Sequence, residues 1–413
     1  MEGAAQAFME GLRSRFSELR DPRVAASCEH LLIDIVAITI LAVASGADDW
    51  TDLETFARLR HEWLKTFLAL PGGIPSHDTF RRVLGLLDPQ QFSVCLFHWT
   101  QALHEATGGK LIAIDGKTLR RSLAKKSGKA ALHLVTAWSS ENGLTLGQVA
   151  CEEKSNEITA IPELLKLLSL QGCTVTIDAM GCQKEIAAQI REQKGHYVLA
   201  LKGNQSSLQE DMQRLSRQAL DGDLAGPGQD RHETEETGHG RCERRGCYVV
   251  EVPRDHPQRR VWKDLRTLAI VTSGREIGGT ETWETRLYVS SHAPRAKQLA
   301  RAIRKHWSIE NCQHWTLDVL FGEDSRRQQD RRGASNLAAV RRLTVSLLRQ
   351  EQTLKRGAKC KRMACAIDPN YLLRVLHSAK NRCVSPGSAT DTAAMSTANR
   401  FYSRAGSSKL VCG

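Results

Sequence analysis

Two aspartates close short apolar segments of the sequence, and a glutamate lies in a later segment with helical spacing. Asp115 ends LIAID (111–115) and Asp178 ends TVTID (174–178), and both segments predict strands of one sheet. If these strands are neighbours, the two carboxylates emerge side by side, where their repulsion favours a bound cation such as Mg²⁺ or Mn²⁺. Glu310, on a helix crossing the same edge, would complete a site for two metal ions that can cleave a phosphodiester bond. Either aspartate alone would more simply cap the turn after its strand, but the pair with a later acid favours the metal site.

Two alternatives remain for the ligands around Glu310. His306, Glu310 and His314 recur every four residues, which is typical of a zinc site, but the segment has no HExxH arrangement and no clear fourth ligand. Asp318, about two turns after Glu310, is the main rival for the third acidic ligand. The twelve cysteines form no CxxC pair, so a structural zinc is not expected.

Helical spacing dominates the first part of the chain. The apolar run 31–46 is too short to cross a membrane and predicts a buried helix. After a Gly/Pro-rich break at 71–76, Ser76 is a good N-cap for a helix that carries Arg81 and Arg82. This arrangement resembles a helix-turn-helix, and two ordinary packed helices remain the slightly simpler interpretation.

The periodicity changes after residue 105. The predicted strands are 111–115, 131–139, 144–151, 174–178 and 196–201, and the predicted helices are 160–170 and 182–194. Glu141, Asn142 and Gly143 predict a hairpin turn, and Pro162 is expected near the first turn of its helix. This order is typical of the opening of a ribonuclease-H-like fold, a mixed sheet with three antiparallel strands and parallel strands joined by helices.

Residues 205–293 interrupt this pattern with a polar, turn-rich start and later strand-like runs. The predicted elements from there on are strands at 247–252, 267–273 and 285–291, then helices at 295–325 and 334–350. The sequence therefore predicts an α/β protein with a ribonuclease-H-like catalytic core and a β-rich insertion, preceded by an all-helical N-terminal domain. The predicted parts are 1–105 (helical, DNA binding), 106–204 (first part of the core), 205–293 (β-rich insertion), 294–378 (core completion, with the Glu310 helix and basic helices) and 379–413 (a tail expected to be disordered).

The charge balance favours a polyanionic partner. The chain has 58 Lys and Arg residues against 46 Asp and Glu, a formal charge of +12 and an isoelectric point near 9.2. Nucleic acid is the commonest partner of such a chain, although a merely soluble basic protein is about as compatible with charge alone. The first residues lack the apolar stretch of a signal peptide, so we expect reduced cysteines, a cytoplasmic location and no membrane partner.

Several long strings carry a family resemblance. They are IAIDGKTLRRS (112–122), EEKSNEITAIPELL (152–165), VTIDAMGCQKEIA (175–187), YVLALKGNQ (197–205) and HWSIENCQHWTLDVLFGED (306–324). Together with the helical segment 19–50 they resemble the DDE transposases of the H-repeat-associated (ISAs-type) insertion-sequence class, over about residues 19–376.

The resemblance implies a ribonuclease-H-like nuclease core that binds two Mg²⁺ or Mn²⁺ ions. Asp115 would contact both ions, while Asp178 and Glu310 would each hold one. The wider family often carries a Tyr and an Arg before this glutamate and a Lys after it. At those spacings this chain has Ile303, His306 and Leu317, so those DNA-end contacts are not carried over.

Basic and polar residues near the acids and in the insertion are candidate DNA contacts. They are Lys117, Arg120, Arg121, Lys202, Asn204, Arg241, Arg245, His306, Trp307, Asn311, Arg326 and Arg327. Arg331, Arg332, Arg341 and Arg342 would extend the last pair into a phosphate track. Each group has a simpler interpretation as a solvated basic turn, an exposed strand face or a solvated helix.

The favoured function is a metal-dependent transposase that acts in a bacterial cytoplasm, in association with the nucleoid. It would bind terminal inverted repeats, hydrolyse a phosphodiester to free a 3′-OH and join that end to target DNA, as a dimer or higher assembly. A catalytically idle DNA-binding relic is the alternative, suggested by the tail from about residue 379, which resembles no part of the family. A plain nuclease without strand transfer is a third possibility.

Overall fold

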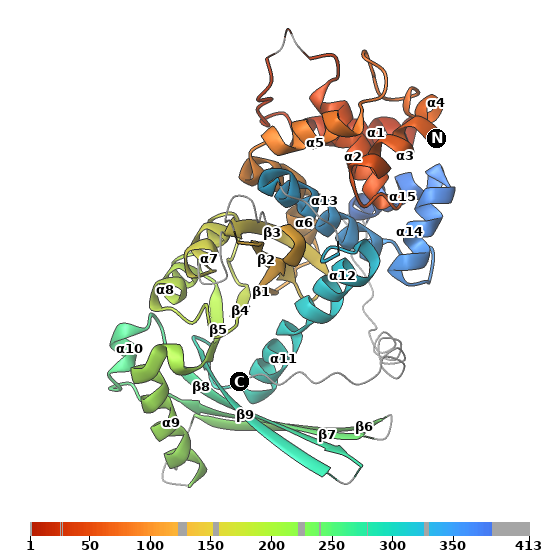
Figure 1. Cartoon of the computed structure of the whole chain (residues 1–413). Helices are drawn as coiled ribbons and strands as arrows, with labels where there is room; N and C mark the ends of the chain where they lie inside the picture. Colours follow the sequence, from red (N-terminus) through yellow and green to blue (C-terminus); the bar gives the residue numbers. More distant parts are fainter. Residues whose placement is uncertain are drawn as a thin grey trace.

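The computed structural model of the chain places helices at one end, a large sheet in the middle and long strands at the other end (Figure 1). It describes residues 2–24, 26, 28–122, 130–151, 157–221, 228–238, 241–278, 280–325 and 330–381. The predicted tail therefore lies almost wholly outside the described residues. No helix within these ranges is long and apolar enough to cross a membrane.

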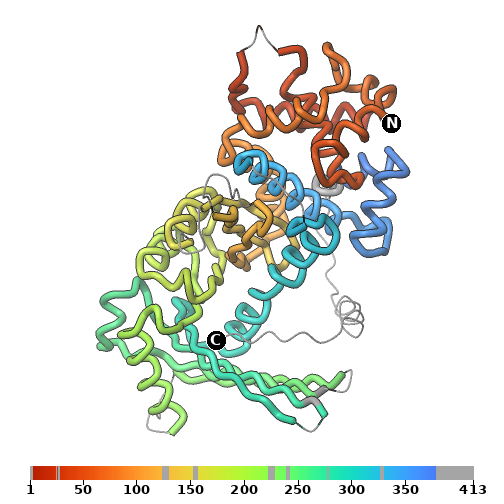
Figure 2. The backbone as a smooth tube through the Cα atoms, in the orientation of Figure 1, coloured from red at the N-terminus to blue at the C-terminus, as the bar shows by residue number. Residues whose placement is uncertain are grey.

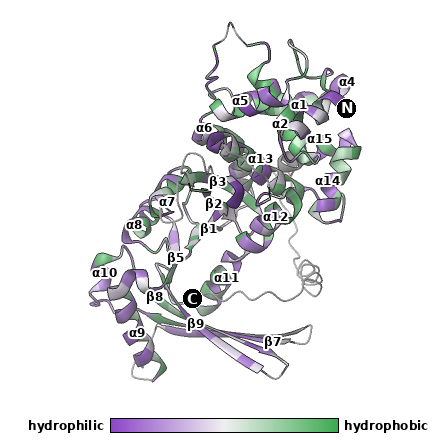
Figure 3. Cartoon of the chain, viewed as in Figure 1, coloured by the Kyte–Doolittle hydropathy of each residue, from purple (hydrophilic) through white to green (hydrophobic). Residues whose placement is uncertain are grey.

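The N-terminal part is helical, as predicted. Its helices are α1 (Glu2–Arg15), α2 (Leu32–Ala44), α3 (Trp50–Leu59), α4 (His61–Leu64), α5 (His77–Leu86) and α6 (Pro89–Ala106). The apolar helix α2 is buried from Asp34 to Ala44 and stands out as hydrophobic in Figure 3. The carboxylate of Asp34 accepts a hydrogen bond from the backbone N–H of Leu70 (2.9 Å), which offsets part of the cost of its burial.

One nine-stranded sheet runs through the rest of the chain, in the order β3-β2-β1-β4-β5-β9-β8-β7-β6. Its first five strands are β1 (Leu111–Leu119), β2 (Leu132–Ser139), β3 (Leu144–Cys151), β4 (Thr174–Ile177) and β5 (His196–Leu201). Strand β1 pairs antiparallel with β2 and β2 with β3, whereas β4 lies parallel to both β1 and β5. The predicted mixed sheet is confirmed. The β2–β3 turn includes Gly143 at φ +67°, a conformation that favours glycine.

The insertion lengthens the same sheet. It contains α9 (Ser206–Leu220), β6 (Gln229–Gly238), β7 (Arg241–Glu251), α10 (Gln258–Val261), β8 (Thr267–Ile277) and β9 (Thr280–Ser290). Strand β9 joins it to the core by pairing antiparallel with β5. The expectation of a polar, turn-rich segment at 221–240 was wrong for β6, and α9 was not predicted. Strand β6 is an exposed edge strand of polar residues, so its sequence lacks the alternation that marks a half-buried strand (Figure 3).

Helices cover both faces of the core sheet. On one face Ile112 and Ile114 of β1 pack in the core shared with α7 (Glu157–Lys166) and α8 (Lys184–Glu192). Ala113 points to the other face and packs with Trp138 and Ile309. Because side chains alternate along a strand, Asp115 and Lys117 belong to this second face.

The second face is covered by the segment that contains Glu310 and by a long buried helix. These elements are α11 (Ala296–His306), a π-helical turn (Ile309–His314), α12 (Trp315–Phe321) and α13 (Arg331–Gln350). The predicted single helix at 295–325 is therefore three pieces. Pro162 also lies inside α7 rather than in its first turn, since α7 includes Glu157.

The C-terminal helices return to the N-terminal ones. Helices α14 (Ala358–Ile367) and α15 (Pro369–Asn381) complete the described chain. Helix α13 packs against α2, α5, α6, α15 and β3. Figure 2 shows these segments side by side although they lie far apart in the sequence. The ion pair between Arg342 on α13 and Glu323 (2.9 Å) is fully buried.

Helix α6 covers the edge of the sheet beside β3. The side-chain amide of Gln101 donates to the backbone carbonyl oxygen of Leu146 (2.7 Å). The hydroxyl of Ser93 donates to the backbone carbonyl oxygen of Gln148 (3.4 Å). These bonds satisfy carbonyls that an edge strand would otherwise leave open, so this edge is closed to further pairing.

Candidate active site

The two aspartates lie side by side at the point where β1 and β4 stop pairing. The last residues paired between these strands are Ile114 and Ile177, so Asp115 and Asp178 are the next residue on each. The prediction that Asp115 ends its strand was wrong, because β2 continues to pair with β1 as far as Leu119. Both aspartates belong to the sheet face crossed by the π-helical turn.

Each aspartate is also held by backbone N–H groups. The N–H of Gly116 donates to Oδ1 of Asp115 (2.9 Å). The N–H of Met180 donates to Oδ1 of Asp178 (3.1 Å), so this aspartate does cap the turn after its strand. Nδ2 of Asn204, a predicted DNA contact, donates to the carbonyl of Ala179 in the same turn (2.7 Å). These bonds fix both carboxylates at one place on the sheet.

Glu310 lies in the π-helical turn rather than in the middle of an α-helix. Two side-chain bonds tie this turn to the sheet: Nε1 of Trp138 donates to the hydroxyl of Ser308 (3.2 Å), and Nε2 of Gln313 donates to the hydroxyl of Thr145 (2.6 Å). A π-turn adds one residue to a helical turn and re-aims the side chains that follow, and such turns are frequent at functional sites.

The three acids interact electrostatically. Burial, then the charges of Glu310 and Asp178, raise the pKa of Asp115 to about 7. Burial and the charge of Asp178 raise the pKa of Glu310, while Arg286 lowers it. Neighbouring carboxylates concentrate negative potential, which attracts cations.

The chemistry of these donors fits a divalent metal ion. Carboxylate oxygens are the ligands that Mg²⁺ and Mn²⁺ prefer, and a cation relieves the repulsion that raises the pKa of Asp115. Within the described part of the chain, no three or more His, Cys, Asp or Glu side chains are grouped closely enough to hold an ion. Asp115, Asp178 and Glu310 remain the candidates for holding such an ion.

The two histidines that suggested a zinc site lie against different partners. Nδ1 of His306 lies 3.0 Å from the hydroxyl of Thr176, and burial lowers the pKa of His306 to about 4. Nδ1 of His314 lies 3.6 Å from Oδ2 of Asp115. His306 thus contacts β4, whereas His314 lies beside the first aspartate.

Lys117 and the rival acid Asp318 form an ion pair. Nζ of Lys117 lies 2.6 Å from Oδ1 of Asp318 and 3.5 Å from Asp324, and the lysine side chain is only 8% exposed. Arg120 is largely exposed and lies 3.3 Å from Asp324. Asp318 is thus neutralised by a buried lysine, unlike Glu310.

The other predicted DNA contacts are scattered. Three of them have exposed side chains: Arg121 follows β1, Lys202 follows β5, and Asn311 lies in the π-turn. Arg245 on β7 pairs with Glu243 and with Glu236 (3.3 Å).

Arg241 begins β7, where its backbone pairs with that of Gly238. A role of Arg241 and Arg245 in DNA binding remains a prediction.

Two of the six arginines in the predicted phosphate track are buried. Arg341 and Arg342 are 1% and 0% exposed, and the guanidinium of Arg341 donates to the carbonyl of Asp48 (2.6 Å). A phosphate track through these two residues is wrong, because α13 is a core helix. Arg331 donates to the carbonyl of Ala130 (2.6 Å), and Arg332 is exposed.

Arg326 and Arg327 lie outside the described residues.

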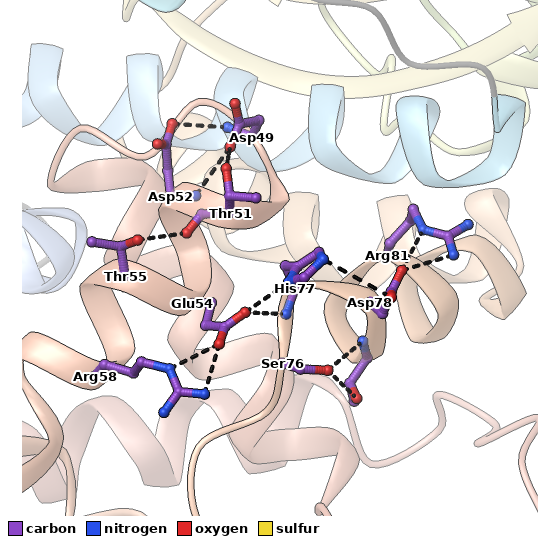
Figure 4. Close-up of polar contacts among 11 residues, drawn as sticks. Asp49, Thr51, Asp52, Glu54, Thr55, Arg58, Ser76, His77, Asp78 and Arg81 are labelled. Carbon is purple, nitrogen blue, oxygen red and sulfur yellow. Dashed lines mark hydrogen bonds and ion pairs between the residues drawn. The ribbon is translucent and has the colours of Figure 1, made fainter.

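The N-terminal helix pair is held by an ion pair that the sequence did not reveal. Ser76 caps α5 as predicted. Glu54 of α3 accepts hydrogen bonds from the backbone N–H of His77 (2.7 Å) and from its Nδ1 (2.9 Å), as Figure 4 shows. Arg81 pairs with Asp78 (2.9 Å). Both interpretations of this pair, DNA-binding motif or packed helices, stay open.

Sequence reasoning missed Arg286 of β9. Its guanidinium carbon lies 5.0 Å from the centre of the Trp307 ring, and its Nε donates to Glu284 (2.7 Å). The local sequence TRLYVSS gives no sign that this arginine lies beside the Glu310 turn, because the contact joins the insertion to the core.

Comparison with known proteins places the chain in a family. A solved piggyBac transposase synaptic complex with hairpin DNA matches 93% of this chain and 79% of its own at 12% identity, with a TM-score of 0.36, too low to relate the folds. Residues 13–100 match the family model described as "DDE_Tnp_1-associated", and residues 106–348 match the "Transposase DDE domain". "Putative transposase YncI" of Escherichia coli O157:H7 is 41% identical over 93% of this chain and 97% of its own length. "H repeat-associated putative transposase YhhI" of Escherichia coli K12 is 38% identical over 89% of this chain and 98% of its own. The chain therefore belongs to the H-repeat-associated class of DDE transposases.

Proposed function

We propose that this chain is a working DNA transposase whose reaction centre is formed by Asp115, Asp178 and Glu310. It would bind the terminal inverted repeats of its element, hydrolyse a phosphodiester bond at each end and join the freed 3′-OH to target DNA. The observation that carries this proposal is that two neighbouring strands and a π-turn bring three acids to one face of the sheet. There, burial and the charges of Glu310 and Asp178 raise the pKa of Asp115.

In this proposal, Asp115, Asp178 and Glu310 would hold two Mg²⁺ or Mn²⁺ ions. Such ions, when bound, activate the attacking oxygen and stabilise the leaving oxygen of the phosphodiester. The protein's own contribution is to orient the acids. The N–H of Gly116 holds Asp115, beside which the imidazole of His314 lies, and the turn capped by Asp178 fixes the second acid.

The topology supports the proposed core. The order β3-β2-β1-β4-β5, with the first three strands antiparallel and the last two parallel to β1, is the arrangement that the sequence led us to expect of a ribonuclease-H-like domain. Because both ends of an element must be cut together, we also propose that two or more copies act in one synaptic complex. The division into a helical N-terminal domain, core and insertion belongs to the same proposal.

The direct test is cleavage of a labelled duplex that carries the element's own ends, with Mg²⁺, with Mn²⁺ and with EDTA. We expect nicking at the end junction that depends on the metal and is lost in Asp115→Asn. A second incubation with plasmid target separates a transposase, which joins the freed end, from a plain nuclease. Tight end binding without nicking in either metal would contradict the proposal and identify a DNA-binding relic.

A further inference from the structure

Arg286 lies where the insertion meets the core sheet. The pairing of β5 with β9 ends at Leu201 and Leu287, and Arg286 is the next residue of β9 beyond that pairing. It shares a strand face with Tyr288, which packs with α11. Since α11 leads directly into the π-turn, the insertion presents this arginine on the side of the sheet that carries the acids.

A chain of contacts fixes the guanidinium relative to those acids. It lies over the ring of Trp307, 5.0 Å from the ring centre, and Trp307 precedes Glu310 by three residues. Trp307 packs edge-on against His306 (5.6 Å between ring centres). His306 in turn lies 3.0 Å from the hydroxyl of Thr176, two residues before Asp178. A cation held over an indole ring is stabilised in one position.

The cation is accessible and lies beside Trp307, on the face of the sheet that carries the acids. The Arg286 side chain is 41% exposed, and its partner Glu284 is 58% exposed. An ion pair so exposed contributes little stability, so a DNA phosphate can replace the carboxylate of Glu284.

We propose that Arg286 binds a backbone phosphate beside the bond to be cut, while Trp307 holds its guanidinium in place. The planar guanidinium donates two parallel hydrogen bonds to a phosphate, which a lysine cannot reproduce. The insertion thereby supplies a positive group beside the acidic centre. This inference rests on the proposed function, because it requires that DNA ends be bound at the three acids.

Arg275 provides a matched control. It lies on the same face of the same sheet, on β8, four residues along the strand from Val271, the residue that pairs with Arg286. At about 3.3 Å per residue this is roughly 13 Å farther from the acids. Arg275 is 54% exposed and pairs with Glu243 (3.5 Å), so it resembles Arg286 in exposure and pairing but not in position.

The test uses end duplexes in which single phosphates around the cleavage junction are replaced by neutral methylphosphonates. Binding is measured for the full-length protein in Ca²⁺, and single-turnover cleavage in Mg²⁺, for wild type, Arg286→Ala, Arg286→Lys and Arg275→Ala. We expect one methylphosphonate beside the junction to weaken binding by wild type about tenfold or more. Replacing that one phosphate should leave binding by Arg286→Ala unchanged, whereas replacements at the other positions should affect this variant as they affect wild type. The slope of log affinity against log salt should fall by about one in Arg286→Ala.

Arg275→Ala should keep the wild-type profile, and Arg286→Lys should keep the salt slope but not the full affinity. If Arg286→Ala shows the same sensitivity as wild type at every phosphate, the inference is wrong even where wild type cleaves normally. If wild type binds the ends but never cleaves, the proposed function fails while the binding profile still decides the role of Arg286. Absence of end binding by wild type would contradict both.

Discussion

The imidazole Nδ1 of His314 lies 3.6 Å from Oδ2 of Asp115. His314 closes the same six-residue π-turn that carries Glu310. The first and third acids are therefore coupled through one short piece of backbone. A change in the turn moves both the Glu310 carboxylate and the imidazole that faces Asp115.

Replacing His314 by Ala should slow cleavage without weakening end binding. Groups that orient metal-binding side chains typically contribute a factor of about 10 to 100 in activity. The measurement is single-turnover nicking beside an equilibrium binding curve for the same duplex. Equal losses in nicking and binding, or a lowered melting temperature that accounts for both, would contradict a positioning role.

Gly116 is expected to tolerate no side chain. A Cβ added there would lie 2.3 Å from Nε2 of His133 and 2.4 Å from Oε1 of Glu157, and these two side chains form a buried pair 2.6 Å apart. Gly116→Ala should lower the free energy of unfolding by about 1–3 kcal/mol and reduce nicking, since Gly116 also donates to Asp115. Gly3→Ala, which meets no atom within 4 Å, should change neither. Wild-type stability and nicking in Gly116→Ala would show that the strand has more room than the structure indicates.

The buried pair of Arg342 and Glu323 is expected to be structural. Both side chains are 0% exposed, so Glu323→Gln leaves a buried guanidinium without its counter-charge. The loss should be about 3–5 kcal/mol in urea unfolding. Glu163→Gln is the matched control, because Glu163 is 49% exposed and pairs with Lys166 on the surface, where little change is expected. A weaker DNA affinity with normal stability in Glu323→Gln would instead return Arg342 to a role in DNA binding.

The stability that the contact between α3 and α5 contributes should depend on pH, because it involves the carboxylate of Glu54. Hydrogen bonds from His77 and Arg58 lower the pKa of Glu54 from 4.5 to about 2. Because the folded-state pKa is depressed, the stabilisation is present above about pH 4.5 and is lost as the pH falls toward 2. Glu54→Gln should therefore cost about 1 kcal/mol at pH 7 and less at pH 3.

Urea unfolding of wild type and Glu54→Gln at both pH values tests this expectation. Glu62→Gln serves as the control, since Glu62 is 84% exposed and pairs only with surface groups. An equal gap between wild type and Glu54→Gln at pH 7 and pH 3 would contradict the assignment.

The core strands could be predicted because their apolar sequences indicate that they are buried. LIAID and TVTID are apolar runs of strand length, and a strand buried on both faces needs such a run. The register that sets Asp115 beside Asp178 follows from pairing Ile114 with Ile177, and local sequence had suggested only that both acids follow apolar strands.

Features that depend on distant contacts could not be predicted. The π-turn around Glu310 is held by Trp138 and Gln313 through bonds to partners more than 160 residues away in the sequence. The exposure of Arg341 and Arg342 was misjudged because charged residues usually lie at the surface, and their partners Asp48 and Glu323 lie on other elements. Arg286 was missed because its contact with Trp307 likewise joins segments that lie apart in the sequence.

The central claim is that Glu310 is the third acid of the reaction centre, and its rival Asp318 offers the sharpest control. The measurement is single-turnover nicking of an end duplex in Mg²⁺ by wild type, Glu310→Gln and Asp318→Asn, with binding of the same duplex followed in parallel. We predict that Glu310→Gln binds normally and nicks roughly a thousandfold more slowly, since a lost metal ligand removes several kcal/mol of transition-state stabilisation. Asp318→Asn should stay within about tenfold of wild type, because Asp318 pairs with Lys117. Normal nicking by Glu310→Gln, or its loss only in Asp318→Asn, would contradict the account.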